Sequence, residues 1–426
     1  MNEQIGALCG FLEESKTFYH ANAAVCRWLT DAGYTRLDEG QVWTLAPGGK
    51  YFVDRNGSSV VAFRLPAGTP AGYMMASAHS DRPTFMVREN GEITGKYTRL
   101  STEKYGVLII APWLDRPLSI AGRVLVQTET GVQTKLIDID RDLTMIPNLA
   151  IHMNRTVNES QSWNVAVDTL PLLGSADVKG KLQALLEQAA GGKILGQDLY
   201  LYLRQKPTVW GLEEEYLSGP GLDDLDCVFG LAQGFLRAAP SQSVSVLCVF
   251  DSEEVGSNSP QGADGTLLSG ILERISRTLG LDHDCMLSNS FMVSADNAHA
   301  IHPNHPELSD STNPVELNGG VVVKFSATQN YTSDGLSAAV FRSICEKAGV
   351  PTQTFYNRAD LRGGATLGHF SLNHVSVPSV DIGLAQLAMH SCYETAGTQD
   401  PIHLINAMAA YFGATLRHTQ QGYTIE

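Results

Sequence analysis

Apolar side chains recur at helical intervals along residues 4–33, for example at Leu8, Phe11 and Leu12, and this spacing predicts helix. The chain then changes to short apolar runs separated by turn residues, which is the pattern of strands. The strands expected there are residues 42–45, 51–53, 60–63 and 73–78.

The stretch from about residue 95 to 203 consists of short β-rich runs between turn residues, and we expect a compact β-rich unit there. From residue 204 onward, strands and helices alternate. Near-continuous apolar strands between amphipathic helices are typical of a mainly parallel sheet that is covered on both faces. Strands are expected at 107–111, 123–127 and 134–139 in the β-rich unit, then at 244–250, 285–294, 321–326 and 377–382, with helices near 224–237, 263–279 and 333–348.

The helix expected at 333–348 carries signals for its start and its end. Ser333 can cap the first turn, and Gly349 followed by Pro351 ends the helix. We therefore predict an α/β fold made of two parts. Residues 1–94 plus 204–426 would form one domain, and the β-rich domain at 95–203 would be inserted into it.

Composition narrows the class of protein. The 426 residues are 43% hydrophobic and 18% charged, and this length favours two domains. The net charge of −15 repels phosphate and anionic lipid, so neither nucleic acid nor a membrane is an expected partner. The apolar runs are far shorter than the ~20 residues that cross a bilayer. Seven cysteines without CxxC spacing, and an N-terminus without signal-like features, favour a cytoplasmic protein.

Acids and histidines directly follow the expected strands, at the edge where open α/β sheets bind ligands. Glu253 and Glu254 are the most informative, because two adjacent glutamates at the end of a buried strand cannot both face solvent, and a cation offsets the cost of burying one. Taken singly, each of these segments is also compatible with a structural role, such as a helix cap or a polar loop. The segments contain His79 with Asp81, Asp223, Glu253 with Glu254, Asp296 with His299, and His390.

Taken together, these side chains supply a donor set for two zinc-like ions. Oxygen and nitrogen ligands without thiolates leave coordination positions open for water, as in catalytic rather than structural sites. The glutamate that binds no metal is then free to act as a base. One ion would take His79 and Asp296, the other Glu254 and His390, and Asp223 would bridge them.

Longer motifs surround these residues and recur in a fixed order along the chain. They are His79–Asp81, Gly106, Trp113–Arg116, Ile146–His152, Leu222–Asp223, Asp251–Ser257, Val293–Pro303 and Leu387–Ser391. With these motifs the sequence resembles the M18 family of metallo-aminopeptidases, whose best-known member is aspartyl aminopeptidase. The resemblance extends from about residue 14 to the C-terminus.

The resemblance implies a zinc-peptidase fold with an inserted β-rich dimerisation domain, and assembly into a tetrahedral dodecamer. It also implies two divalent ions per subunit, expected to be Zn²⁺. The zinc ligands that it implies are His79, Asp223, Glu254, Asp296 and His390.

Other residues receive roles from the same resemblance. Asp81 would support His79, and Glu253 would be the general base. His152 would reach into the active site of a neighbouring subunit, and the residues implied to contact substrate are His299 and Lys324. One departure is Arg82, because the family usually has a small residue after the His-x-Asp motif; the substitution bears on local charge and substrate preference.

We therefore expect a dinuclear zinc aminopeptidase that removes N-terminal residues, acidic ones by family implication, with Glu253 as general base. One alternative is another dinuclear zinc hydrolase, either a broad aminopeptidase or an amidohydrolase of acylated amino acids, which the ligand set does not distinguish. A catalytically idle scaffold stabilised by metal is a second alternative, although a scaffold needs no unligated base. A nucleotide-binding protein is disfavoured because the chain has no GxGxxG or P-loop motif.

Overall fold

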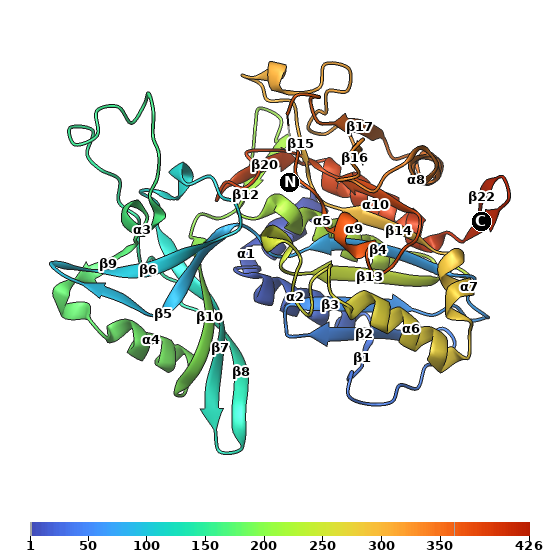
Figure 1. Cartoon of the computed structure of the whole chain (residues 1–426), viewed down its shortest axis with the longest axis horizontal. Coiled ribbons are helices and arrows are strands. Elements are labelled where there is room, and N and C mark those ends of the chain that lie inside the picture. The colour runs from blue at the N-terminus through green and yellow to red at the C-terminus, as the bar shows by residue number, and fades with distance from the viewer. Residues whose placement is uncertain (1, 362) are drawn as a thin grey trace.

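The computed structural model describes residues 2–361 and 363–426, and within these ranges it holds a nine-stranded main sheet, a six-stranded second sheet, a five-stranded third sheet and a hairpin. The main sheet carries helices on both faces, and the second sheet lies beside it (Figure 1). In spatial order the main sheet contains β1 (Thr35–Arg36), β2 (Lys50–Arg55), β3 (Ser59–Arg64), β13 (Val244–Phe250), β4 (Tyr73–His79), β14 (Phe291–Ala295), β18 (Ser379–Gly383), β16 (Val321–Phe325) and β17 (Thr352–Tyr356).

The centre of the main sheet is parallel. Strands β13, β4, β14 and β18 all run in one direction, whereas β2, β3 and β16 contribute antiparallel pairings at the flanks. This confirms the predicted α/β class. Because the centre is parallel, the carboxyl ends of β13, β4 and β14 meet at one edge.

Two groups of helices bury the two faces of the main sheet. Side chains of β4 alternate between two hydrophobic clusters, with Met74 and Ala76 in one and Tyr73 and Met75 in the other. Burial on both faces explains why the strand reads as an unbroken apolar run. The first face is covered by α1 (Glu3–Glu14), α2 (Phe18–Asp31), α5 (Leu222–Arg237), α8 (Gly335–Lys347) and α10 (Asp400–Gly413), and the second by α6 (Leu267–Leu279), α7 (His283–Ser288) and α9 (Leu367–Ser371).

The second sheet is antiparallel and has its own hydrophobic core, to which α4 (Lys181–Ala190) contributes. Its first strand begins at Thr84, ahead of the domain boundary expected at residue 95. The short helix α3 (Val165–Asp168) lies in the same part of the chain. In spatial order this sheet contains β8 (Gly131–Asp138), β7 (Leu118–Thr128), β10 (Ile194–Leu203), β5 (Thr84–Thr94), β6 (Tyr97–Tyr105) and β9 (Leu172–Ser175).

The third sheet is small and draws on segments that are far apart in the chain. The C-terminal hairpin pairs β21 (Leu416–Thr419) with β22 (Gly422–Ile425). In spatial order the third sheet contains β11 (Thr208–Trp210), β12 (Tyr216–Gly219), β20 (Glu394–Gly397), β19 (Ala385–Leu387) and β15 (Ala298–His299).

Some local predictions were wrong. The helix expected at 4–33 is two helices, α1 and α2, separated by a short break. Residues 42–45 and 107–111 are not strands, and the apolar side chains Val42 and Val107 are 95% and 74% exposed there. An exposed apolar residue gains nothing from the alternating burial that stabilises a strand.

Two further predictions changed in detail. The run 285–294 contains the end of α7 before β14 begins. Helix α8 is capped by Asp334 rather than by Ser333, because the Asp334 carboxylate accepts the N–H of Ser337 in a capping box. All seven cysteines are free thiols. Within the described ranges, no helix combines the length and apolar character needed to cross a bilayer.

Candidate active site

Parallel strand register brings residues from distant parts of the chain to one edge of the main sheet. His79 is the last residue of β4, and Phe250 at the end of β13 lies directly opposite it. The glutamates follow at once in a single 3₁₀ turn, Glu253–Val255. On the other side of β4, β14 runs parallel and is followed by Asp296. The strand-end residues predicted from the sequence therefore lie side by side.

Asp223 and His390 reach the same place from other elements. Asp223 lies at the start of α5, which packs against β4, and His390 lies in the loop that joins β19 to β20. The carboxylate of Glu394 accepts hydrogen bonds from both backbones, at 3.0 Å from the N–H of Asp223 and 2.7 Å from the N–H of His390. One side chain thus fixes both segments.

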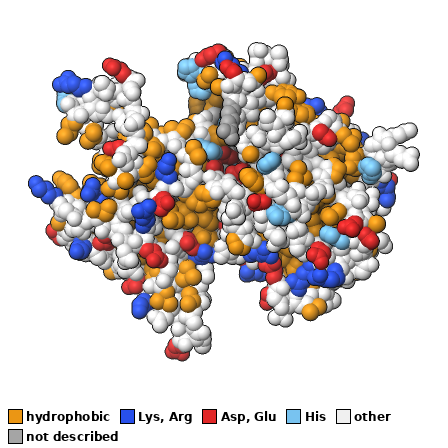
Figure 2. Space-filling view, in the orientation of Figure 1, with side chains coloured by type: hydrophobic (Ala, Val, Ile, Leu, Met, Phe, Trp, Pro, Cys, Tyr) orange, Lys and Arg blue, Asp and Glu red, His pale blue; other side chains and the backbone are white. Residues whose placement is uncertain are grey.

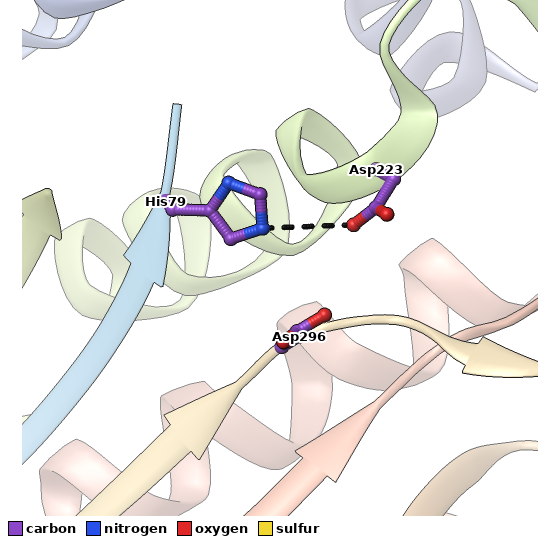
Figure 3. Close-up of side chains that lie close together, drawn as sticks. All are labelled: His79, Asp223 and Asp296. Atoms are coloured by element: carbon purple, nitrogen blue, oxygen red, sulfur yellow. Dashed lines mark ion pairs between the residues drawn. The ribbon is translucent and has the colours of Figure 1, made fainter. Parts of the chain in front are cut away.

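The two carboxylate oxygens of Asp223 face different histidines. Oδ1 lies 3.6 Å from Nε2 of His79, and Oδ2 lies 3.4 Å from Nε2 of His390. The same nitrogen of His390 is 3.4 Å from Oε1 of Glu254. Figure 3 shows His79 at the end of its strand, Asp223 at the start of its helix and Asp296 just beyond β14, all around one space. Asp223 therefore lies between two groups of donors.

The donor side chains suit a metal ion in two ways. Their atom types are those of metal ligands, and some of their buried oxygens lack hydrogen-bond partners among the described residues. His79, Asp223 and Asp296 are at most 9% exposed. Oδ1 of Asp223 and Oε1 of Glu254 are buried and find no hydrogen-bond partner in the described part of the chain, an arrangement that a cation would relieve. Nitrogen and oxygen donors without thiolates suit an open zinc site. Around this cavity, the groups whose donor atoms lie within 4.8 Å of one another are His79–Asp223–Asp296, His79–Glu253–Glu254 and Asp223–Glu254–His390, and a fourth group, Asp224–Asp226–Cys227, lies in α5.

The electrostatics reflect an excess of buried negative charge. Burial, followed by repulsion from Asp296 and Asp81, raises the pKa of Glu253 to about 8, although nearby His79 acts to lower it. Burial, followed by repulsion from Asp223, raises the pKa of Glu254 well above its usual value. These carboxyl groups therefore hold protons near neutral pH unless a cation replaces them.

The same negative charges also raise the pKa values of the histidines, because they favour the protonated ring. Burial lowers the pKa of His79, but the nearby carboxylates of Asp223 and Asp81 outweigh it and raise the pKa well above the usual value. Burial also lowers the pKa of His390, and the carboxylate of Asp223 raises it overall. Each ring is thus held by acceptors that fix its orientation.

These residues line a cavity of about 230 Å³. Figure 2 shows acidic side chains in a hollow near the middle of this face. His299, Lys324 and Tyr331 also line the cavity. Lys324 is 2% exposed, and its amine donates to the carbonyls of Asp296, at 2.7 Å, and Asn297, at 3.2 Å. The cavity thus combines the carboxylates with the cationic side chain of Lys324.

Asp81 is buried behind the cavity and acts as an acceptor. Its carboxylate accepts the backbone N–H groups of Glu253 and Glu254, each at 3.1 Å. Its backbone carbonyl lies 3.0 Å from Nδ1 of His79, while its Oδ1 lies 3.5 Å from that nitrogen. The contact to the ring is therefore shared between the backbone and the side chain of Asp81.

His152 is not brought to this cavity. It lies exposed in the loop between β8 and α3 and is not among the residues that line the cavity. Arg82 also points elsewhere: its guanidinium donates to the carbonyls of Lys16, at 2.5 Å, and Pro220, at 3.3 Å. The departure from the family pattern at Arg82 therefore places no cation in the cavity.

Two residues with close contacts to this site were missed in the sequence. Glu394 follows His390 by four positions, so an acid close to this histidine was a signal that reasoning from the sequence did not use. Tyr105 donates its hydroxyl to Oδ2 of Asp81 at 2.8 Å, and no local pattern marks it.

Known proteins match this chain over most of their length. A family model described as aminopeptidase I zinc metalloprotease (M18) matches residues 11–412. A probable M18 family aminopeptidase 2 from Clostridium novyi is 41% identical over 409 residues, which cover 92% of this chain and 94% of the relative.

Solved structures agree with this match. Ape4 in the cryo-EM structure of the Ape4 and Nbr1 complex has a TM-score of 0.92 at 32% identity, covering 96% of this chain and 85% of that one. The S. cerevisiae mApe1 dodecamer shares the fold, with a TM-score of 0.84 at 24% identity and coverage of 96% and 95%. This chain therefore belongs to the M18 family of zinc metallo-aminopeptidases, which are peptide hydrolases.

Proposed function

We propose that this enzyme is a dinuclear zinc aminopeptidase that removes acidic residues from the N-termini of peptides. His79 and Asp296 would hold one ion, Glu254 and His390 would hold the other, and Asp223 would bridge them. When bound, such a pair of ions lowers the pKa of water and polarises the scissile carbonyl. The observation that carries the proposal is the position of Asp223, whose two oxygens each face a histidine from a different element.

Glu253 is the proposed general base. Its carboxylate lines the cavity, and its backbone is held by Asp81, so the side chain starts from a fixed position. A base must be ionised before it can take a proton, and positive charge bound nearby would lower its raised pKa toward the working range. Glu253 would take a proton from the attacking water and deliver it to the leaving amine.

Lys324 is the proposed reason for the acidic preference. Among the described residues that line the cavity, it is the one with a permanent cation. A buried ammonium group forms a strong charge-assisted contact with a carboxylate, so a substrate with an N-terminal Asp or Glu would gain more than one with Leu. His299, which also lines the cavity, would contact the same substrate.

The second sheet is the proposed assembly domain. We take it as an insertion of residues 84–203, because its first strand begins at Thr84 and its last ends at Leu203. The loop that carries His152 also exposes apolar side chains, Leu149 at 56% and Met153 at 76%. Exposed apolar side chains close together on one loop support an interface with other copies of the chain. We propose a dodecamer like that of mApe1, in which His152 would reach a neighbouring active site.

A metal titration combined with a substrate panel tests the function. The enzyme is stripped with a chelator, reloaded with counted Zn²⁺, and assayed on Asp-, Glu-, Leu- and Lys-anilides. We expect activity to rise until two ions per chain are bound, and to be greatest on the acidic substrates. Activity on acylated amino acids alone would favour the amidohydrolase, equal activity on all anilides the broad aminopeptidase, and binding without any hydrolysis the idle scaffold.

The general base is tested by Glu253→Gln, with the exposed Glu89→Gln as the matched control. We expect Glu253→Gln to keep both ions while kcat falls roughly 10²- to 10⁴-fold, the range for losing acid–base catalysis. Full turnover in a metal-loaded Glu253→Gln enzyme would rule out the assignment.

A further inference from the structure

One short segment connects the second sheet to the active site. Strand β6 ends at Tyr105, and the chain then crosses toward the main sheet through residues 105–109, which we call the crossing segment. Figure 1 shows that β6 lies in the second sheet, away from the helices that cover the main sheet. The crossing segment therefore belongs to one unit and contacts the other.

Its first contact is made by Tyr105. The hydroxyl donates to Oδ2 of Asp81 at 2.8 Å, and that same oxygen accepts the backbone N–H of Glu254. The ring is held by aromatic neighbours: its centroid is 5.9 Å from that of Phe18 and 5.6 Å from that of Tyr200. A hydroxyl on a fixed ring can hold a carboxylate in one orientation.

The next residue, Gly106, allows the crossing segment to pass close to a proposed ligand. Its φ is +74°, and a Cβ atom there would lie 3.1 Å from Cβ of Glu254 and 3.3 Å from its carbonyl oxygen. A side chain at this position would be strained and would press on Glu254. The crossing segment thus packs directly against the turn that carries Glu253 and Glu254.

The end of the crossing segment holds the His390 loop. The N–H of Ile109 donates to the His390 carbonyl at 3.0 Å. The side chains of Val107 and Ile109 point outward, at 74% and 46% exposed. Three successive parts of one segment therefore touch Asp81, Glu254 and His390.

We propose that Tyr105 is a positioning residue for the hydrolytic reaction, and that the crossing segment transmits the arrangement of the second sheet to the active site. Through Asp81, the Tyr105 hydroxyl orients the backbone turn from which Glu253 and Glu254 extend. This proposal rests on the function proposed above, since it assumes that those glutamates take part in catalysis and metal binding.

The test compares Tyr105→Phe with Tyr200→Phe. The first removes the hydroxyl that holds Asp81, and the second removes a hydroxyl from the same aromatic cluster, where the Tyr200 ring meets that of Tyr105 edge to face. Both keep the rings, so both variants should fold, which circular dichroism and Tm will verify. We expect kcat of Tyr105→Phe to fall roughly 10- to 100-fold with little change in KM, the loss expected for a hydrogen bond to a charged group.

A second measurement does not depend on catalysis. Metal-free protein is reloaded with Co²⁺, and its visible absorption is recorded, because these bands respond to the arrangement of the ligands. We expect altered bands and weaker Co²⁺ binding in Tyr105→Phe and a wild-type spectrum in Tyr200→Phe. Because Tyr105 acts through Asp81, Tyr105→Phe should add little to the defect of Asp81→Asn in the double variant.

The outcomes separate this proposal from the function on which it rests. If wild-type enzyme shows no metal-dependent hydrolysis, the proposed function fails. If wild-type enzyme is active but Tyr105→Phe matches Tyr200→Phe in kcat and in the Co²⁺ spectrum, the positioning role alone is wrong. Full additivity of Tyr105→Phe and Asp81→Asn would also overturn it.

Discussion

The carboxylate of Glu394, the first residue of β20, accepts the backbone N–H of His390 in the preceding loop at 2.7 Å. Its second oxygen accepts the N–H of Asp223, a residue 171 positions away in the sequence. Glu394 is 1% exposed, so its carboxylate is shielded from solvent. Each of its two oxygens accepts one of these backbone hydrogen bonds. The side chain thus fixes the distance between the bridging carboxylate and a histidine.

We expect Glu394→Gln to weaken metal binding. The variant keeps the shape of the side chain but replaces one acceptor oxygen by an NH₂ group, which cannot accept a backbone N–H. Loss of such a partner behind a ligand costs roughly 10- to 100-fold in metal affinity. The loss of metal affinity is measured as the zinc retained after dialysis against a graded chelator series. The exposed Glu103→Gln is the control. Wild-type retention would show that Glu394 is not needed to hold these segments.

Metal removal should make the protein's stability depend on pH. Without metal, the folded pKa of Glu253 is raised from 4.5 to about 8, so its contribution to stability is present below pH 4.5 and is lost as the pH rises through 8. Bound metal removes this dependence. The Tm gap between zinc-loaded and metal-free protein should therefore widen between those pH values, and less so in Glu253→Gln. A gap that is constant with pH would contradict the raised pKa.

Zinc binding should release protons for the same reason. The pKa values of Glu253, Glu254 and His79 are all raised in the metal-free site, so a cation displaces protons from these groups near neutral pH. Calorimetric titration of Zn²⁺ in buffers of different ionisation enthalpy measures the release. Heats that are independent of the buffer would mean that the site is already ionised.

The acidic preference should depend on Lys324. We expect Lys324→Met to lower the ratio of kcat/KM for Asp-anilide over Leu-anilide roughly 10- to 100-fold, because a charge-assisted contact is lost. The control is Lys104→Met, an exposed lysine on β6. Should the preference for Asp survive in Lys324→Met, another group must recognise the acidic side chain.

Arg82 should affect stability rather than specificity. Its guanidinium bonds the carbonyls of Lys16 and Pro220, and burial lowers its pKa to about 10. Arg82→Met leaves both carbonyls without that donor, and we expect a loss of about 1–3 kcal/mol in the free energy of unfolding. The Asp-to-Leu substrate ratio should not move. A changed ratio at unchanged stability would place Arg82 at the substrate.

The centre of the fold was predictable because burial on both faces leaves a simple signature. Residues 244–250 form an unbroken apolar run and are β13 in the structure. Polar residues directly after such strands must gather where parallel strands end, so His79, Glu254 and Asp296 could be grouped before their distances were known. The segments around His390 and Asp223 were less informative. The resemblance to the M18 family implied the ligand roles of these two residues, which the residue pattern alone left open.

The remaining features depend on contacts that no local pattern encodes. The apolar run at 107–111 suggested a strand, but it crosses between two units with Val107 and Ile109 exposed. Tyr105 and Asp81 are 24 residues apart, and only the arrangement of the second sheet brings them together. His152 is not among the residues that line the cavity of its own chain, so this fold assigns it no role there.

In the proposed function, one carboxylate, Asp223, bridges two ions. Anomalous diffraction at the zinc edge from crystals of the zinc-loaded enzyme locates those ions. If Asp223 is the bridge, two peaks should lie roughly 3.5–4 Å apart, one beside each oxygen of Asp223. A single peak, or peaks that lie away from Asp223, would rule the bridge out.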